Sequence, residues 1–123
     1  MINPLALIIE DDDRIADIFS MALQAAEYEI EVVSDGTKAL KRLTEVEPAI
    51  VILDLHLPRV SGKDILSHIR ADERLAKTRV ILATADALMA ESLREKADLV
   101  LLKPVGVGQL RDLASRMRPA PTE

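Results

Sequence analysis

The feature that most constrains this chain is the regular alternation of short apolar runs with amphipathic segments. Five runs have the length and composition of strands, at residues 5–9, 29–33, 49–53, 80–83 and 99–102. The segments between and after them repeat apolar residues at helical spacing, at residues 15–23, 39–46, 65–69, 88–96 and 107–117, and the fourth has the weakest pattern. Parallel strands need crossover connections, which are usually helices, so the alternation predicts an α/β fold with a five-stranded parallel sheet.

The composition agrees with a single domain built on this plan. The chain has 123 residues and only 2% aromatic residues, so its core must consist of aliphatic side chains, as is usual in parallel sheets. The run at 29–33 alternates glutamates with apolar residues, which indicates an edge strand with one wet face. We expect one domain over residues 1–118, followed by a flexible tail or the start of a linker at 119–123, where proline and polar residues cannot continue a helix.

Charge and hydropathy exclude several classes of function. The formal net charge is -5 and the basic residues are scattered among acids, so we expect no direct nucleic-acid binding by this domain. No apolar run approaches the roughly 20 residues of a membrane helix, and no basic leader precedes an apolar run. The absence of cysteine removes disulfides and thiolate chemistry. These features predict a soluble cytoplasmic protein without a membrane contact.

Polar residues of a particular kind follow or end four of the five apolar runs. The first run meets the acids at 10–13, the third meets Asp54, the fourth meets Thr84 and the fifth meets Lys103. In open parallel sheets, ligands bind outside the carboxyl ends of the strands. We therefore expect these side chains to lie close together, with Asp12 or Asp13 also capping the helix that follows.

This set of groups suits phosphoryl chemistry. Converging carboxylates repel one another unless a cation neutralises them, and Mg²⁺ typically takes one or two carboxylates together with phosphate oxygens. The ammonium of Lys103 and the hydroxyl of Thr84 can stabilise the charge of a phosphoryl group in transit. Asp54 stands apart from the acidic run and can itself accept phosphate as an acyl phosphate.

Four segments resemble the sequence blocks of response-regulator receiver domains of two-component signalling. They are "LIIEDD", "VILDLHLP", "ILATAD" and "LLKPV", and they occur in the family's order over nearly the whole chain. The resemblance implies a doubly wound, flavodoxin-like receiver fold with five helices and the strand order 2-1-3-4-5. It also implies a phosphoacceptor domain that takes a phosphoryl group from a histidine kinase or a histidine phosphotransfer protein and then switches conformation.

The resemblance also assigns roles to individual residues. Asp54 falls on the phosphoacceptor, and Thr84 and Lys103 fall on the groups that bind the phosphoryl group and switch. The ligands expected for Mg²⁺, or for Mn²⁺, are Glu10, Asp11, Asp54 and the backbone carbonyl of His56. The family pattern further implies a cis peptide bond before Pro104. We expect the side chains of His56 and Asp86 to tune dephosphorylation.

Two departures from the family pattern leave an alternative function open. Val100 occupies a position that is usually aromatic in receivers, and the segment from Thr84 to Ala97 is a few residues short, so we expect a short or shifted fourth helix. Both favour a receiver-like interaction module with weakened or phosphate-independent switching. An aspartate-dependent phosphohydrolase is a weaker alternative, because His56 replaces the second acid that such enzymes carry.

Partners and output are only partly defined by the sequence. The resemblance places the kinase-docking surface around residues 14–22 and describes a signalling domain that is not a turnover enzyme. No output partner is indicated. Homodimerisation through the last helix and strand stays open as an alternative to a monomer.

Overall fold

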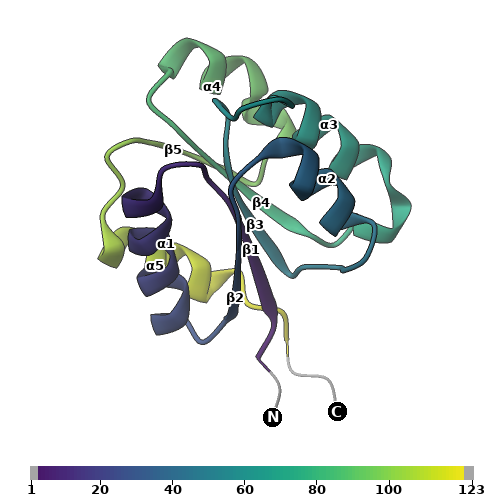
Figure 1. Ribbon diagram of the computed structural model, residues 1–123. Helices are drawn as coiled ribbons and strands as arrows, with labels where there is room; N and C mark the ends of the chain where they lie inside the picture. Colours follow the sequence, from purple (N-terminus) through teal and green to yellow (C-terminus); the bar gives the residue numbers. More distant parts are fainter. Residues whose placement is uncertain (1–2, 121–123) are drawn as a thin grey trace.

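The computed structural model describes residues 3–120 and shows one parallel sheet covered by helices on both faces (Figure 1). The strands β1 (Leu5–Ile9), β2 (Glu29–Val33), β3 (Ile50–Asp54), β4 (Arg79–Thr84) and β5 (Leu99–Leu102) follow the order β2-β1-β3-β4-β5. The helices are α1 (Asp13–Ala25), α2 (Gly36–Leu43), α3 (Gly62–Ala71), α4 (Ala87–Leu93) and α5 (Val107–Arg116). The predicted fold class and strand order are confirmed.

The boundaries differ from the predicted ones at two strands that carry functional candidates. The structure ends β3 on Asp54 and β4 on Thr84, one residue later than the apolar runs suggested. The fourth helix is short, as expected, because α4 has 7 residues and passes into the 3₁₀ helix η2 (Arg94–Lys96). Another 3₁₀ helix, η1 (Glu73–Leu75), precedes β4. The last three residues of the predicted tail, 121–123, lie outside the described residues.

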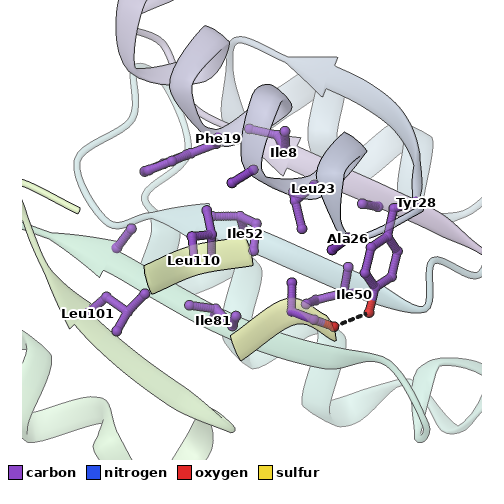
Figure 2. Packing of buried hydrophobic residues seen from close by; sticks show 14 residues of the cluster. Ile8, Phe19, Leu23, Ala26, Tyr28, Ile50, Ile52, Ile81, Leu101 and Leu110 are labelled. Carbon is purple, nitrogen blue, oxygen red and sulfur yellow. Dashed lines mark hydrogen bonds between the residues drawn. The ribbon is translucent and has the colours of Figure 1, made fainter. Parts of the chain in front are cut away.

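The core consists of two apolar layers, one on each face of the sheet. Side chains alternate along each strand, so that Ile8 and Ile52 face α1 and α5, whereas Leu7 and Leu53 face α2 and α3. Figure 2 shows the first layer, in which Phe19 packs among aliphatic side chains. All five residues of β3 are buried, as expected for the central strand of a sheet that is covered on both faces.

The edge strand β2 departs from the pattern that its sequence suggested. Its edge position is confirmed, and Glu29 is exposed. Val32, however, is 46% exposed. Glu31 is half-buried in a two-point ion pair with Arg42 of α2, with Nε–Oε2 and Nη2–Oε1 distances of 2.6 and 3.0 Å. An ion pair therefore joins β2 to α2, which the alternating pattern did not reveal.

None of the helices within residues 3–120 has both the length and the hydrophobicity that a membrane-spanning helix needs.

Candidate functional site

The predicted polar residues meet at the carboxyl edge of the three central strands. Glu10 directly follows β1, Asp54 ends β3 and Thr84 ends β4, and the ladder places Asp54 opposite Ala83 and Leu53 opposite Ile9. The exposed fractions of these polar residues are 2% for Glu10, 4% for Asp54 and 0% for Thr84. The sheet therefore brings two carboxylates and a hydroxyl together where they are almost fully buried, and strand pairing fixes their positions.

The carboxylates form a cluster with the composition of a site for a hard cation. Glu10, Asp11 and Asp54 each offer an oxygen atom, and these oxygens lie within 4.8 Å of one another. Two of the three residues are buried, and Asp11 is exposed at the mouth. Such an all-oxygen, partly open donor set fits a divalent ion that keeps some of its waters, as Mg²⁺ does.

Asp12 belongs to the acidic run but points its carboxylate elsewhere. Its Oδ1 accepts hydrogen bonds from the backbone amides of Arg14 and Ile15 at 2.9 and 3.2 Å, which makes it the N-cap of α1. The expectation that Asp12 or Asp13 caps this helix is confirmed.

Lys103, which follows β5, supplies a positive charge to the cluster. Its Nζ lies 2.8 Å from Oε1 of Glu10 and 3.5 Å from Oδ1 of Asp54. Its backbone amide donates to the carbonyl of Thr84 at 2.8 Å, and its peptide bond with Pro104 is cis. The ammonium group is therefore held between the two buried carboxylates.

Burial and charge act on this group of residues in opposite directions. Burial is the largest influence on Glu10 and raises the pKa of its carboxyl group, assisted by the charge of Asp54 and opposed by the hydrogen bond from Lys103. Burial alone would lower the pKa of Lys103, but the hydrogen bond to Glu10 and the charge of Asp54 outweigh it and raise that pKa. The site thus holds a firmly charged ammonium beside Glu10, whose pKa is raised mainly because its carboxyl group is buried.

Asp86 and His56 lie at the mouth of the site, next to the buried Thr84. The hydroxyl oxygen of Thr84 accepts a hydrogen bond from the amide of Asp86 at 3.0 Å, and Asp86 caps α4 through the amide of Met89. Nε2 of His56 lies 3.6 Å from Oδ2 of Asp86. The amide of His56 donates to Oδ1 of Asp54 at 3.2 Å. The role of the His56 backbone carbonyl as a metal ligand stays a prediction.

Gly62 is a residue of the site that the sequence analysis did not single out. An added Cβ would lie 2.3 Å from the carbonyl oxygen of Asp54 and 2.6 Å from Cα of Leu55, distances that a real side chain does not tolerate. The amide of Gly62 also donates to the carbonyl of Leu55 at 3.1 Å. The available signal was a glycine at the junction of the loop with the third predicted helix.

Val100 lies away from these polar contacts. Its half-buried side chain packs against the apolar layer that faces α2 and α3, and its register partner is Leu82. The structure therefore places an aliphatic side chain where the family pattern has an aromatic one.

Comparison with known proteins agrees with this geometry. The model of the response regulator receiver domain matches residues 6–115. The DNA-binding dual master transcriptional regulator RpaA of Synechocystis sp. is 34% identical over 87% of this chain and 46% of its own length. The DNA-binding response regulator MtrA of Mycobacterium tuberculosis is 30% identical over 91% of this chain and 48% of its own. The chain thus spans about half the length of these curated relatives.

A solved structure supports the same assignment. The response regulator TrrA of Thermotoga maritima, determined in complex with Mg²⁺-BeF, is 26% identical, has a TM-score of 0.82, and aligns over 93% of this chain and 98% of its own. Its fold, the family match and the cluster at the carboxyl edge of the sheet lead to one conclusion. This chain belongs to the response regulator receiver domain family of two-component signalling.

Proposed function

We propose that Asp54 accepts a phosphoryl group in a reaction that depends on Mg²⁺. The observation that carries this proposal is the position of its carboxylate, which is 4% exposed, belongs to a cluster of three acids and lies 3.5 Å from the ammonium of Lys103. A carboxylate in such surroundings is held ready as a nucleophile, while the cation beside it can offset the charge of an incoming phosphoryl group.

The proposed step transfers phosphorus from nitrogen to oxygen. A carboxylate oxygen of Asp54 attacks the phosphorus of a partner's phosphohistidine, the P–N bond breaks, its electron pair returns to the imidazole, and an acyl phosphate forms. Lys103 and Thr84 stabilise charge on the phosphoryl oxygens. A Mg²⁺ ion held by Glu10, Asp11 and Asp54 would supply the remaining positive charge.

The same contacts suggest how the chain would respond to phosphorylation. In this structure Lys103 pairs with Glu10 at 2.8 Å, and the hydroxyl of Thr84 accepts from the amide of Asp86 at 3.0 Å. Phosphoryl oxygens would compete with Glu10 for the ammonium of Lys103 and would accept a hydrogen bond from the hydroxyl of Thr84, and so bias the loops that follow β4 and β5. We therefore assign a signalling role with one phosphoryl group per cycle and not a turnover enzyme. His56 and Asp86 at the mouth would set how fast water removes that group.

Intact-mass measurement tests the chemistry directly. The protein is incubated with acetyl phosphate and Mg²⁺, with and without EDTA, as wild type, as Asp54→Asn and as Asp64→Asn. Asp64 is an exposed acid in the first turn of α3, so its change matches the charge loss away from the cluster. We expect one added phosphoryl group, dependent on Mg²⁺, in the wild type and in Asp64→Asn only. Equal labelling of Asp54→Asn would contradict the assignment.

We further propose that a histidine kinase or phosphotransfer protein docks on α1 beside the site. Ile18 and Met21 are 38% and 59% exposed on this helix. A mostly apolar hollow of about 310 Å³ lies between α1 and the segment from Lys103 to Val105. Its walls reach Lys103, so a partner seated there would present its phosphohistidine close to Asp54.

A change of Ile18 separates docking from chemistry. Ile18→Glu should slow phosphotransfer from a phosphorylated histidine-kinase fragment but leave labelling by acetyl phosphate unchanged. Val32→Glu, at the exposed edge strand, is the matched control. Equal slowing by both changes, or no slowing by Ile18→Glu, would remove α1 from the docking surface.

A further inference from the structure

A second hollow lies at the opposite edge of the sheet, where the strands β3, β4 and β5 begin. It measures about 620 Å³ and is formed by the loops before β3 and β4, the end of α3 and the segment after α5. Six basic side chains and only two acidic ones line it, although the chain as a whole carries a net charge of -5. The basic residues are Arg70, Arg74, Lys77, Arg79, Arg116 and Arg118.

The acids of this hollow neutralise only part of its positive charge. Asp98 forms ion pairs with two guanidinium groups. Its Oδ2 lies 3.0 Å from Nη2 of Arg70, and its Oδ1 lies 3.3 Å from Nη1 of Arg79. Oδ2 also accepts the amide of Val80 at 2.7 Å. Partial burial opposes ionisation of Asp98, but the Val80 amide and the Arg70 guanidinium together lower its pKa. The other acid, Glu47, lies 3.9 Å from Nη1 of Arg74, whose Nη2 lies 3.7 Å from Asp72 just outside the hollow.

Three of the cations can still bind an anion, because the described residues do not satisfy all of their charges and donors. Within residues 3–120, neither Lys77 nor Arg116 has an acidic partner within 4.0 Å. Nε of Arg118 is buried and has no hydrogen-bond acceptor among these residues, although its Nη1 lies 3.6 Å from Glu27. A buried donor without an acceptor is costly, and an anion in the hollow would remove that cost.

Two of the arginines are also held in place. Arg70 donates to the carbonyls of Lys96 and Thr78 at 2.6 and 3.2 Å, and Arg74 donates to the carbonyl of Val46 at 3.2 Å. These bonds already use most of the donors of both guanidinium groups, so the two arginines fix the walls and contribute positive charge, while Lys77, Arg116 and Arg118 keep donors for an anion. The walls are therefore preorganised for an anion with several oxygens.

We propose that this hollow binds a small organic anion that carries two or more phosphate groups, such as a nucleoside triphosphate. Its volume falls in the range of small-ligand pockets, about 300–1,000 Å³. None of the lining residues is aromatic, so phosphate groups and not a stacked base would supply the recognition. The site is distinct from the acidic cluster, because Arg79 begins β4 and Thr84 ends it, about 17 Å apart at the usual rise per residue.

Calorimetry together with amide NMR tests this proposal on the whole chain in low-salt buffer free of divalent cations. The probes are ATP, pyrophosphate and a duplex oligonucleotide. The proteins are the wild type, Lys77→Ala/Arg116→Ala and Lys38→Ala/Lys41→Ala. The last variant removes two exposed lysines of α2 and therefore matches the change in charge.

We expect ATP and pyrophosphate to bind the wild type and to shift the amides of Thr78, Asp98 and Arg118. Binding should weaken at least about tenfold in Lys77→Ala/Arg116→Ala, the effect of losing one charge-assisted hydrogen bond. It should stay unchanged in the α2 control. No binding, equal weakening in both variants, shifts confined to the surroundings of Asp54, or binding of the oligonucleotide alone would each overturn the proposal.

Discussion

Tyr28 offers a measurement in which one buried hydroxyl can be followed alone. It is the single tyrosine of a chain without tryptophan, so the ultraviolet absorbance of tyrosinate reports this group and no other. Its side chain is 3% exposed, and its hydroxyl donates to the carbonyl of Ala114 in α5 at 2.9 Å (Figure 2). Burial raises its pKa to about 12, although the charges of Arg118 and Arg79 oppose the shift.

The direction of the resulting pH dependence follows from the two pKa values. The unfolded chain releases the phenolic proton near the ordinary value of 10.0, whereas the folded chain holds it to about 12. The stability contribution of Tyr28 is therefore fully present below the lower value and is lost as the pH rises through the higher one. The whole shift corresponds to about 2.7 kcal/mol, and about half of that should be lost at about pH 11.

The variant Tyr28→Phe separates this loss from the titration of lysines. At neutral pH we expect it to cost about 1 kcal/mol in the free energy of unfolding. The cost stays small because the carbonyl of Ala114 keeps a second donor, the amide of Met117 at 3.1 Å. Near pH 11 the loss of about 1.4 kcal/mol in the wild type alone should make the two proteins almost equally stable.

Urea unfolding of both proteins at neutral pH and near pH 11, with an absorbance titration of the wild type, gives all the required quantities. A titration midpoint near 10 in the folded protein would refute the reasoning. So would a stability difference between Tyr28 and Phe that does not change with pH.

Three further changes test other parts of the fold. Gly62→Ala should destabilise the protein by about 1–3 kcal/mol and slow phosphorylation, because its Cβ meets the carbonyl of Asp54; urea unfolding and intact mass measure both. Gly108→Ala, whose nearest contact is 3.9 Å away in α5, should instead stabilise by about 0.5–1 kcal/mol in the same assay. Asp98→Ala should lower the free energy of unfolding by about 1–3 kcal/mol, because the amide of Val80 loses its acceptor. The wild type should lose stability as the pH falls below 3.8, and the variant should not show that loss. Equal acid sensitivity of the wild type and the variant would contradict this prediction.

The sequence was sufficient to predict which polar residues meet, because each of them follows or ends a strand of the parallel sheet. Parallel strands end at one edge, so the polar residues that follow or end four of the five apolar runs were expected to approach one another, as Glu10, Asp54 and Thr84 do. The confirmed strand order came from the family resemblance. Periodicity alone would have given a parallel sheet without the arrangement of its strands.

Contacts between distant segments could not be predicted in the same way. The pair of Lys103 with Glu10 joins residues 93 positions apart, and its distance depends on how two loops turn after their strands. The basic hollow was missed for a related reason. Its cations are scattered among acids along the chain, and only the return of several loops to one edge of the sheet gathers Arg70, Arg79 and Arg116.

The central position of β3 determines when the acidic cluster comes apart as the protein unfolds. β3 is hydrogen-bonded to β1 on one side and to β4 on the other, and the amides of Glu10 and Lys103 donate to Val33 and Thr84. Backbone amides in such a ladder exchange with solvent deuterium only when the whole sheet opens. We therefore expect exchange at Asp54 to match global unfolding, while the loop after it exchanges sooner. The position of the Asp54 carboxylate would then be kept for as long as the protein stays folded, and local motion would be confined to the segments around it.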